Sequence, residues 1–356
     1  MLGTFRDADK WLKNIGVAML ENTLEDWRNR ALTYENELNA TIIGLAPAIR
    51  SLVIAIFARG HVLLEGNVGV GKTTLLRAAA RGLGGGYQRI EGTIDLMPQD
   101  LIYHTYIDQD GKPRVDPGPI LGQGENLSVF FFNEINRARP QVHSLLLRVM
   151  AERSVTAFNR EYYFPHLLVF ADRNAVEKEE TFELPGAARD RFLMELEINP
   201  ANTSSVHKSL TFDTRFHDTD KLIEQVTAGN VGFDALTPFA PVIQNSVTAG
   251  DAVQDFVEHL RRATHRPQDY GIQLPEVDMD ELMIAGMGPR GTSMLVRAAK
   301  VSAWLDGRLE LAPQDVAAVF HQVVAHRVFF TPIYELQRNW LAKAYTQAIL
   351  HSVPTT

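Results

Sequence analysis

The feature that most constrains this chain is a glycine-rich loop between an apolar strand pattern and a helix pattern. Residues 61–81 read HVLLEGNVGVGKTTLLRAAAR, and residues 66–73 fit the spacing G-x-x-x-x-G-K-[ST]. Backbone N–H groups of such a loop, at the positive end of a helix, form a phosphate-binding cradle. A glycine turn that only caps a βα unit is the plainer alternative, but the strand before the loop and the helix after it favour a nucleotide-binding P-loop.

The P-loop pattern predicts a different role for each of two polar residues. Lys72 is expected to reach the β- and γ-phosphate oxygens, and the Thr73 hydroxyl is expected to hold Mg²⁺. The glycines let the backbone approach the phosphates closely. The predicted nucleotide-binding residues of the loop are Gly66, Asn67, Val68, Gly69, Val70, Gly71, Lys72, Thr73 and Thr74.

Composition excludes several other classes of protein. The 356 residues include no cysteine, which rules out disulfides, iron–sulfur clusters and thiolate zinc sites and fits a reducing compartment. The N-terminus lacks a signal-peptide pattern, and no apolar run reaches the length of a membrane span. We therefore expect a cytoplasmic protein without membrane insertion. A net charge of −8 and a pI near 5.8 argue against nucleic acid as a partner.

Strand patterns recur after the P-loop and alternate with helix patterns. Further strands are expected at 87–90, 127–132 and 167–170. A helix is expected at 140–152, opened by a first-turn proline. This alternation predicts an α/β fold with a parallel, doubly wound sheet, which binds ligands at the carboxyl ends of its strands. Gly66, Glu134 and Asn174 all follow strand patterns, so we expect them to converge.

The remaining chain divides into regions of different character. The strand pattern stops after Phe192, and the C-terminal region reads as mostly helical. The expected organisation is a helical extension at 1–37, an α/β core at 38–198 with an insert at 91–127 and a hairpin at 154–164, a boundary region with weak helices at 199–250, and a helical domain at 251–356.

Several stretches together resemble the MoxR branch of the AAA+ ATPases. Besides the P-loop they are QRIEGTIDLMPQDL, VDPGPILG, FFFNEINRARPQVHSLLLRVMAERSVT, ADRNAVEKEETFELP, AARDRFLMELEI and GMGPRG. The resemblance is close over 38–198 and looser over about 285–328. It implies an AAA+ P-loop core with a C-terminal helical lid, using ATP and Mg²⁺.

The resemblance also implies how such a protein works. Its relatives assemble as rings, usually hexamers, with the nucleotide between subunits, and couple hydrolysis to remodelling or maturing a partner protein. Many act with a partner that carries a von Willebrand factor A domain. The insert at 91–127 and the hairpin at 154–164 would project toward the ring pore.

Four further residues match functional positions of the family. Glu134, after an apolar strand, is the candidate base or water-orienting residue, and Asn174 matches the sensor that places the attacking water. Arg191 matches the arginine finger that reaches a neighbouring subunit, with Arg189 as a nearby competitor. Arg290 resembles a second sensor that touches the γ-phosphate from the lid. The plainer alternatives are a helix cap for Glu134, a strand-end turn for Asn174 and surface arginines.

Asn133 is the main departure from the family pattern, which has aspartate here to reach Mg²⁺ through its water shell. Asparagine removes one negative charge beside the cation, which by analogy lowers metal affinity or activity roughly 10–100-fold. The alternatives are therefore a slow ATPase and a nucleotide-gated adaptor with little turnover, in which restoring aspartate at position 133 would raise hydrolysis sharply. A nucleic-acid-linked motor is a fainter third hypothesis, and the choice between ATP and GTP stays open.

Overall fold

The core of the protein is a five-stranded, all-parallel sheet in the order β2-β5-β8-β1-β9. The computed structural model describes residues 17–174, 182–199 and 203–355. The strands are β1 (Val62–Glu65), β2 (Gly86–Glu91), β5 (Leu127–Asn133), β8 (Leu168–Arg173) and β9 (Met194–Glu197). The parallel α/β core that the sequence predicts is confirmed, and the carboxyl ends of β5, β8 and β1 lie side by side.

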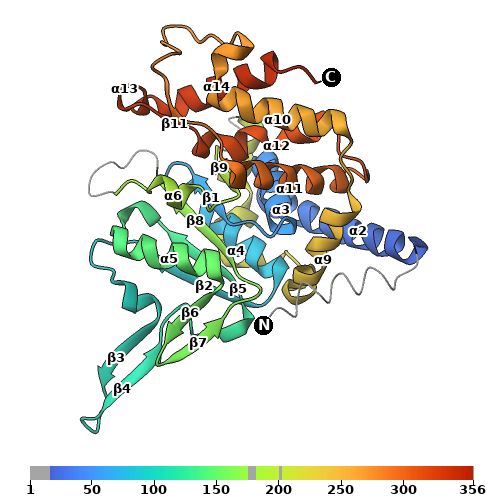
Figure 1. Cartoon of the computed structure of the whole chain (residues 1–356). Helices are drawn as coiled ribbons and strands as arrows, with labels where there is room; N and C mark the ends of the chain where they lie inside the picture. The colour runs from blue at the N-terminus through green and yellow to red at the C-terminus, as the bar shows by residue number, and fades with distance from the viewer. Residues whose placement is uncertain (1–16, 175–181, 200–202, 356) are drawn as a thin grey trace.

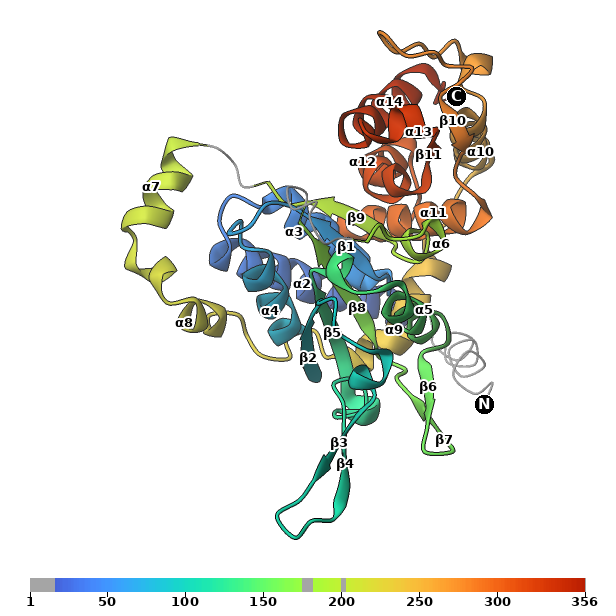
Figure 2. The same ribbon diagram turned by 90° about the vertical axis from the view of Figure 1, so that its left-hand side faces the viewer.

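Helices cover both faces of this sheet. The helices α2 (Val17–Thr41), α3 (Ala46–Phe57) and α4 (Lys72–Leu83) lie on one side of it, and α5 (Pro140–Glu152) lies on the other (Figure 2). Along β5, Phe131 packs into the first layer, whereas Phe130 and Phe132 pack into the second. Because both faces are buried, the strand reads as a continuous apolar run rather than an alternating one.

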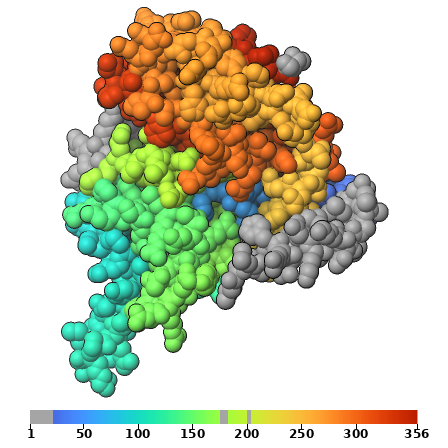
Figure 3. Space-filling view, viewed as in Figure 1, coloured from blue at the N-terminus to red at the C-terminus, as the bar shows by residue number. Residues whose placement is uncertain are grey.

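Two antiparallel hairpins leave the core on the side away from the C-terminal region (Figures 1 and 3). The pairs are β3 (Tyr103–Ile107) with β4 (Pro113–Pro117), and β6 (Ser154–Ala157) with β7 (Arg160–Tyr163). The second is the hairpin expected at 154–164, and the first lies within the insert at 91–127. The rings of Tyr103 and Phe158 lie 5.0 Å apart, so the turn of the β6–β7 hairpin contacts the start of β3.

The C-terminal region is mostly helical, as the sequence predicts, and forms a lid above the core (Figure 1). It comprises α10 (Asp251–His265), α11 (Pro289–Leu305), α12 (Pro313–Val324), α13 (Pro332–Glu335) and α14 (Arg338–Ser352), with a short antiparallel pair, β10 (Met283–Ala285) and β11 (Phe329–Phe330). Arg327, fully buried, ties the lid to the core because it donates to the Asp190 carboxylate at 3.1 Å and the Leu193 carbonyl at 3.2 Å. In the described residues, no helix is both long and apolar enough to cross a membrane.

Two elements differ from the sequence-based expectation. The sheet has one more strand after Phe192, where the sequence pattern predicted none, because β9 pairs with β1 and forms one edge of the sheet. Its glutamates, Glu195 and Glu197, make the four-residue strand look polar. Within 199–250, α7 (Ser204–Phe212) and α8 (Thr219–Glu224) fit the expected weak helices. The last helix there, α9 (Phe233–Ser246), is a packed core helix whose two internal prolines obscure it in the sequence.

The N-terminal helix is part of the core rather than an outer attachment. The expected boundary between residues 37 and 38 falls inside α2, and residues 1–16 lie outside the described part. Trp27 of α2 stacks on Phe239 of α9 with ring centroids 4.4 Å apart. Trp304 of α11 donates its indole N–H to the Leu24 carbonyl at 3.2 Å. The helix α2 thus contacts both α9, within the region 199–250, and the lid.

Acid should destabilise this core through His61, which precedes β1. Its Nδ1 accepts the Val169 N–H at 2.9 Å, so that nitrogen carries no proton in the fold. Burial, and secondarily the charge of Arg153, lowers the pKa of His61 to about 3. Because the unfolded chain binds this proton below about pH 6.5, stability falls as pH drops from there, by about 2 kcal/mol between pH 7 and pH 5. Urea unfolding at pH 7 and pH 5 should show that the free energy of unfolding depends less on pH in His61→Gln than in the wild type. An unchanged pH dependence would contradict the role given to His61.

Candidate nucleotide-binding site

The P-loop joins β1 to α4 with the backbone that its glycines make possible. Gly69 and Gly71 have φ values of 78° and 91°, in the left-handed region that favours glycine. A Cβ at either position would meet no atom within 4 Å, so the constraint there is conformational. At Gly66 it is steric, because a Cβ would lie 2.7 Å from the Ile198 carbonyl oxygen. The loop is therefore held against the edge strand while its middle stays open.

Lys72 is the first residue of α4 and lies back over the loop. Its Nζ donates to the Gly66 carbonyl at 2.6 Å and lies 3.4 Å from Oδ2 of Asp172. The first N–H groups of a helix have no partner within the helix and are available to an anion. Cation and helix terminus are thus together, as the P-loop pattern predicts.

Glu134, the candidate base, stands at the end of β5 in an unusual backbone conformation. Its φ and ψ are 53° and 50°, which is strained for a residue with a side chain. Its N–H donates to Oδ1 of Asp172 at 2.6 Å, and its carboxylate pairs with Arg137 at 2.9 Å. Gly92 approaches so closely that a Cβ there would lie 2.1 Å from the Glu134 carbonyl oxygen. Contacts on several sides therefore fix this residue.

Asn133 is turned away from the P-loop strand. Its side-chain amide donates to the carboxylate of Glu91 at the end of β2. The sheet order places β2 on the side of β5 opposite to β8 and β1. The side chain of Asn133, the predicted metal residue, is thus bound to β2 and not directed toward β8 and β1.

Asp172 is the functional candidate that sequence reasoning missed. It lies on β8, between β5 and β1, and is only 2% exposed. Burial raises the pKa of this carboxyl group, against the opposing effects of the Glu134 N–H and the Lys72 ammonium. The available signal was an acidic residue inside an otherwise apolar strand, where burial of a charge requires a partner.

Two hollows flank the P-loop between the core and the lid. One, of about 760 Å³, is lined by Asn174 and Arg189 from the core and by Arg338 from the lid. The other, of about 280 Å³, is lined by Gly66, Asn67 and lid residues that include His321 and Lys343. Glu65 lines both, and Asn339 of α14 donates to it at 3.1 Å. Asn174 thus lines one hollow and Gly66 the other, while Arg338 and Asn339 of the lid line both; Lys72 and Glu134 are not among the described residues that line them.

Arg191 and Arg290 lie together elsewhere. Arg290 pairs with Oδ2 of Asp190 at 2.9 Å, and the adjacent Arg191 donates to the Ala187 carbonyl at 2.8 Å. Neither is among the described residues that line the two hollows. Arg290 is thus placed beside the candidate arginine finger rather than beside its own P-loop.

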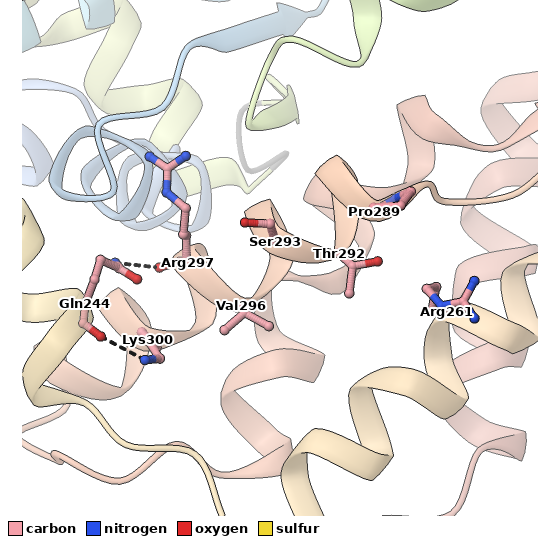
Figure 4. A pocket seen from close by; sticks show the side chains of 8 residues that line it. All are labelled: Gln244, Arg261, Pro289, Thr292, Ser293, Val296, Arg297 and Lys300. Atoms are coloured by element: carbon pink, nitrogen blue, oxygen red, sulfur yellow. Dashed lines mark hydrogen bonds between the residues drawn. The ribbon is translucent and has the colours of Figure 1, made fainter.

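A further hollow of about 530 Å³ lies on the lid, between α9, α10 and α11 (Figure 4). Lys300 donates to the Gln244 carbonyl at 2.8 Å, and Gln244 in turn donates to the Arg297 carbonyl at 3.1 Å. Of the described residues that line it, none belongs to the P-loop. It is a separate, shallow surface and not part of the nucleotide cleft.

The residues present fit Mg²⁺ carried by a nucleotide. The described residues contain no cluster of three or more His, Asp or Glu that would hold a metal by itself. Mg²⁺ is typically held by phosphates and waters with one or two protein oxygens, which a Thr73 hydroxyl and a nearby carboxylate provide. The lysine, the open loop and the oxygen donors therefore suit a magnesium–nucleotide complex.

Comparison with known proteins agrees with this fold. Residues 61–194 match the model described as ATPase family associated with various cellular activities (AAA), and residues 279–343 match the AAA lid domain. The crystal structure of an ATPase candidate from Cytophaga hutchinsonii superposes with a TM-score of 0.79 at 27% identity, covering 94% of this chain and 97% of that one. Fold and site thus define a P-loop ATPase of the AAA+ class.

Curated relatives narrow the class to one family. The chain is 58% identical to Protein MoxR of Methylorubrum extorquens, covering 93% of this chain and 96% of that protein. It is 51% identical to Protein MoxR of Paracoccus denitrificans, covering 94% and 99%. Chaperone MoxR1 of Mycobacterium tuberculosis is 32% identical, with 89% and 78% covered. The chain belongs to the MoxR family of AAA+ ATPases.

Proposed function

We propose that this chain is a ring-forming, Mg²⁺-dependent ATPase that remodels or matures a partner protein. The observation that carries the proposal is that Lys72 and Glu134 both contact Asp172 beside the P-loop. Asn174, two residues further along the chain, lines a hollow between core and lid. At this site Lys72 would neutralise phosphate charge, while Glu134 and Asn174 would orient the attacking water. Bound Mg²⁺ would supply charge neutralisation at the phosphates, with the Thr73 hydroxyl as one of its holders.

The placement of two arginines supports assembly of several copies. Arg290 pairs with Asp190, the residue before Arg191, neither arginine is among the described residues that line the two hollows, and the Arg290 side chain is 55% exposed. An exposed arginine in such a place would be available to stabilise transition-state charge in a neighbouring copy. We propose a closed homo-oligomer, a hexamer by family analogy, in the cytoplasm. One relative is named a chaperone, and the proposed client is a protein, a von Willebrand factor A domain protein being the first candidate.

The second candidate function is the nucleotide-gated adaptor. The observation that favours it is Asn133, which brings no charge to the site and is bound to Glu91. Under this alternative ATP stabilises assembly but is not turned over, and Asn133→Asp raises hydrolysis sharply. Under the ATPase proposal the wild-type chain already hydrolyses ATP, and Asn133→Asp gives no sharp rise.

The remodelling proposal is tested by following the chain's mass and its effect on a heat-denatured model enzyme. Light scattering should show assembly on addition of ATP and Mg²⁺, and recovery of the denatured enzyme should depend on ATP. Lys72→Ala should lose both responses, since it removes the cation at the phosphates. A wild-type chain that stays monomeric with nucleotide, or that protects the enzyme no better than Lys72→Ala, would contradict the proposal.

A further inference from the structure

The structure poses a charge problem at the end of β5. P-loop NTPases hold their metal with the P-loop hydroxyl and an aspartate from a neighbouring strand. Here Asn133 ends β5 without a negative charge, and its amide is bound to Glu91. The carboxylate that pairs with the P-loop lysine comes instead from β8, where Asp172 lies 3.4 Å from Lys72.

Strand register places this carboxylate on the correct face of the sheet. On β8, Leu168 and Phe170 pack into the layer that contains α4, so Asp172 points to that same face. Asp172 lies opposite Leu64 of β1, two residues before the P-loop begins. Because β8 separates β5 from β1, an acidic residue at its end is one strand closer to the P-loop than position 133.

The contacts of Asp172 join the two working parts of the site. Oδ2 lies 3.4 Å from the Lys72 ammonium, and Oδ1 accepts the Glu134 N–H at 2.6 Å. The second contact holds Glu134 in its left-handed conformation, a strained state that persists only when its surroundings fix it. A carboxylate this buried needs partners for its charge, and the Lys72 ammonium and the Glu134 N–H are those partners.

We propose that Asp172 is the metal-facing carboxylate of this nucleotide site, supplying from β8 the charge that Asn133 does not supply from β5, and that it positions Lys72 and the backbone of Glu134. The proposal rests on the proposed nucleotide-binding function. Asn133 is then an inter-strand link to Glu91 and not a metal residue.

The test compares binding of a fluorescent, non-hydrolysable ATP analogue to the full chain with Mg²⁺ and with chelator. In Asp172→Asn, the Mg²⁺ concentration that gives half of the gain in affinity should rise roughly 10–100-fold. Affinity without metal should be unchanged or tighter, because a negative charge beside the phosphates has been removed. A side chain with a structural role alone would not separate these two affinities.

The matched control is Asp315→Asn, which removes an equally buried carboxylate from α12, where Asp315 pairs with Arg308. It should lower the unfolding temperature without changing the Mg²⁺ response. If Asp172→Asn keeps the wild-type Mg²⁺ response, or loses metal-free binding to the same extent, the inference is overturned while the proposed function stands. If the wild-type chain does not bind the analogue at all, the proposed function and the inference both fail.

Discussion

Glu134→Gln should lower steady-state ATP turnover by roughly 10²–10⁴-fold while leaving nucleotide binding intact. The amide has nearly the shape of the carboxylate and can still accept from Arg137, which pairs with Glu134 at 2.9 Å. It cannot take a proton from the attacking water. The strained backbone at this position also depends on contacts that the substitution keeps. The measurement is phosphate release together with binding of a fluorescent ATP analogue.

Glu152→Gln provides the control for this experiment. Glu152 is an exposed carboxylate of α5 that pairs with Arg148, so its loss changes net charge equally without touching the cleft. Its turnover should match that of the wild type. Turnover in Glu134→Gln within a few fold of this control would show that Glu134 is a structural residue at the strand end.

Arg173→Leu should cost about 3–5 kcal/mol of folding stability. The guanidinium lies 2.7 Å from Glu65 of β1 and 2.8 Å from Glu195 of β9, and all three side chains are less than 20% exposed. Burial tends to raise the pKa of Glu65, but Arg173 outweighs it and holds that pKa below its usual range. Without Arg173, two buried carboxylates on the neighbouring strands β1 and β9 lose the cation that they share. Urea unfolding at pH 7 measures the loss.

The pH dependence separates this charge effect from lost packing. In Arg173→Leu the unpaired carboxylates should acquire raised pKa values in the folded state, so the deficit should shrink as the pH falls and they take up a proton. Arg148→Leu, which breaks an exposed pair on α5, should cost less than about 1 kcal/mol. A loss in Arg173→Leu as small as that control, or one that grows on acidification, would contradict the account.

Sequence reasoning succeeded where the determining contacts are local. The P-loop, helix α5 and the two hairpins are specified by glycines, a first-turn proline and alternating residues within each segment. The helix α9 was missed because its signal is masked by Pro238 and Pro241, although tertiary packing of its apolar face outweighs their cost.

The charge arrangement of the site could not be derived in the same way. Glu134 and Asn174 follow apolar strands, and this position together with the family resemblance marked them as candidates. The importance of Asp172 depends on β8 lying between β5 and β1, which is a property of strand order and not of any one segment. For the same reason Arg290 was expected in its own cleft, whereas lid docking places it against Asp190.

ATP hydrolysis by this chain is tested most directly by the rate of phosphate release from the purified wild type with ATP and Mg²⁺, measured beside the same chain with chelator and beside Lys72→Ala. We expect Mg²⁺-dependent turnover in the wild type alone, since Lys72, Glu134 and the carboxylate of Asp172 are together despite Asn133. Tight nucleotide binding with phosphate release no faster than in Lys72→Ala would contradict it, and would identify the chain as a nucleotide-gated scaffold.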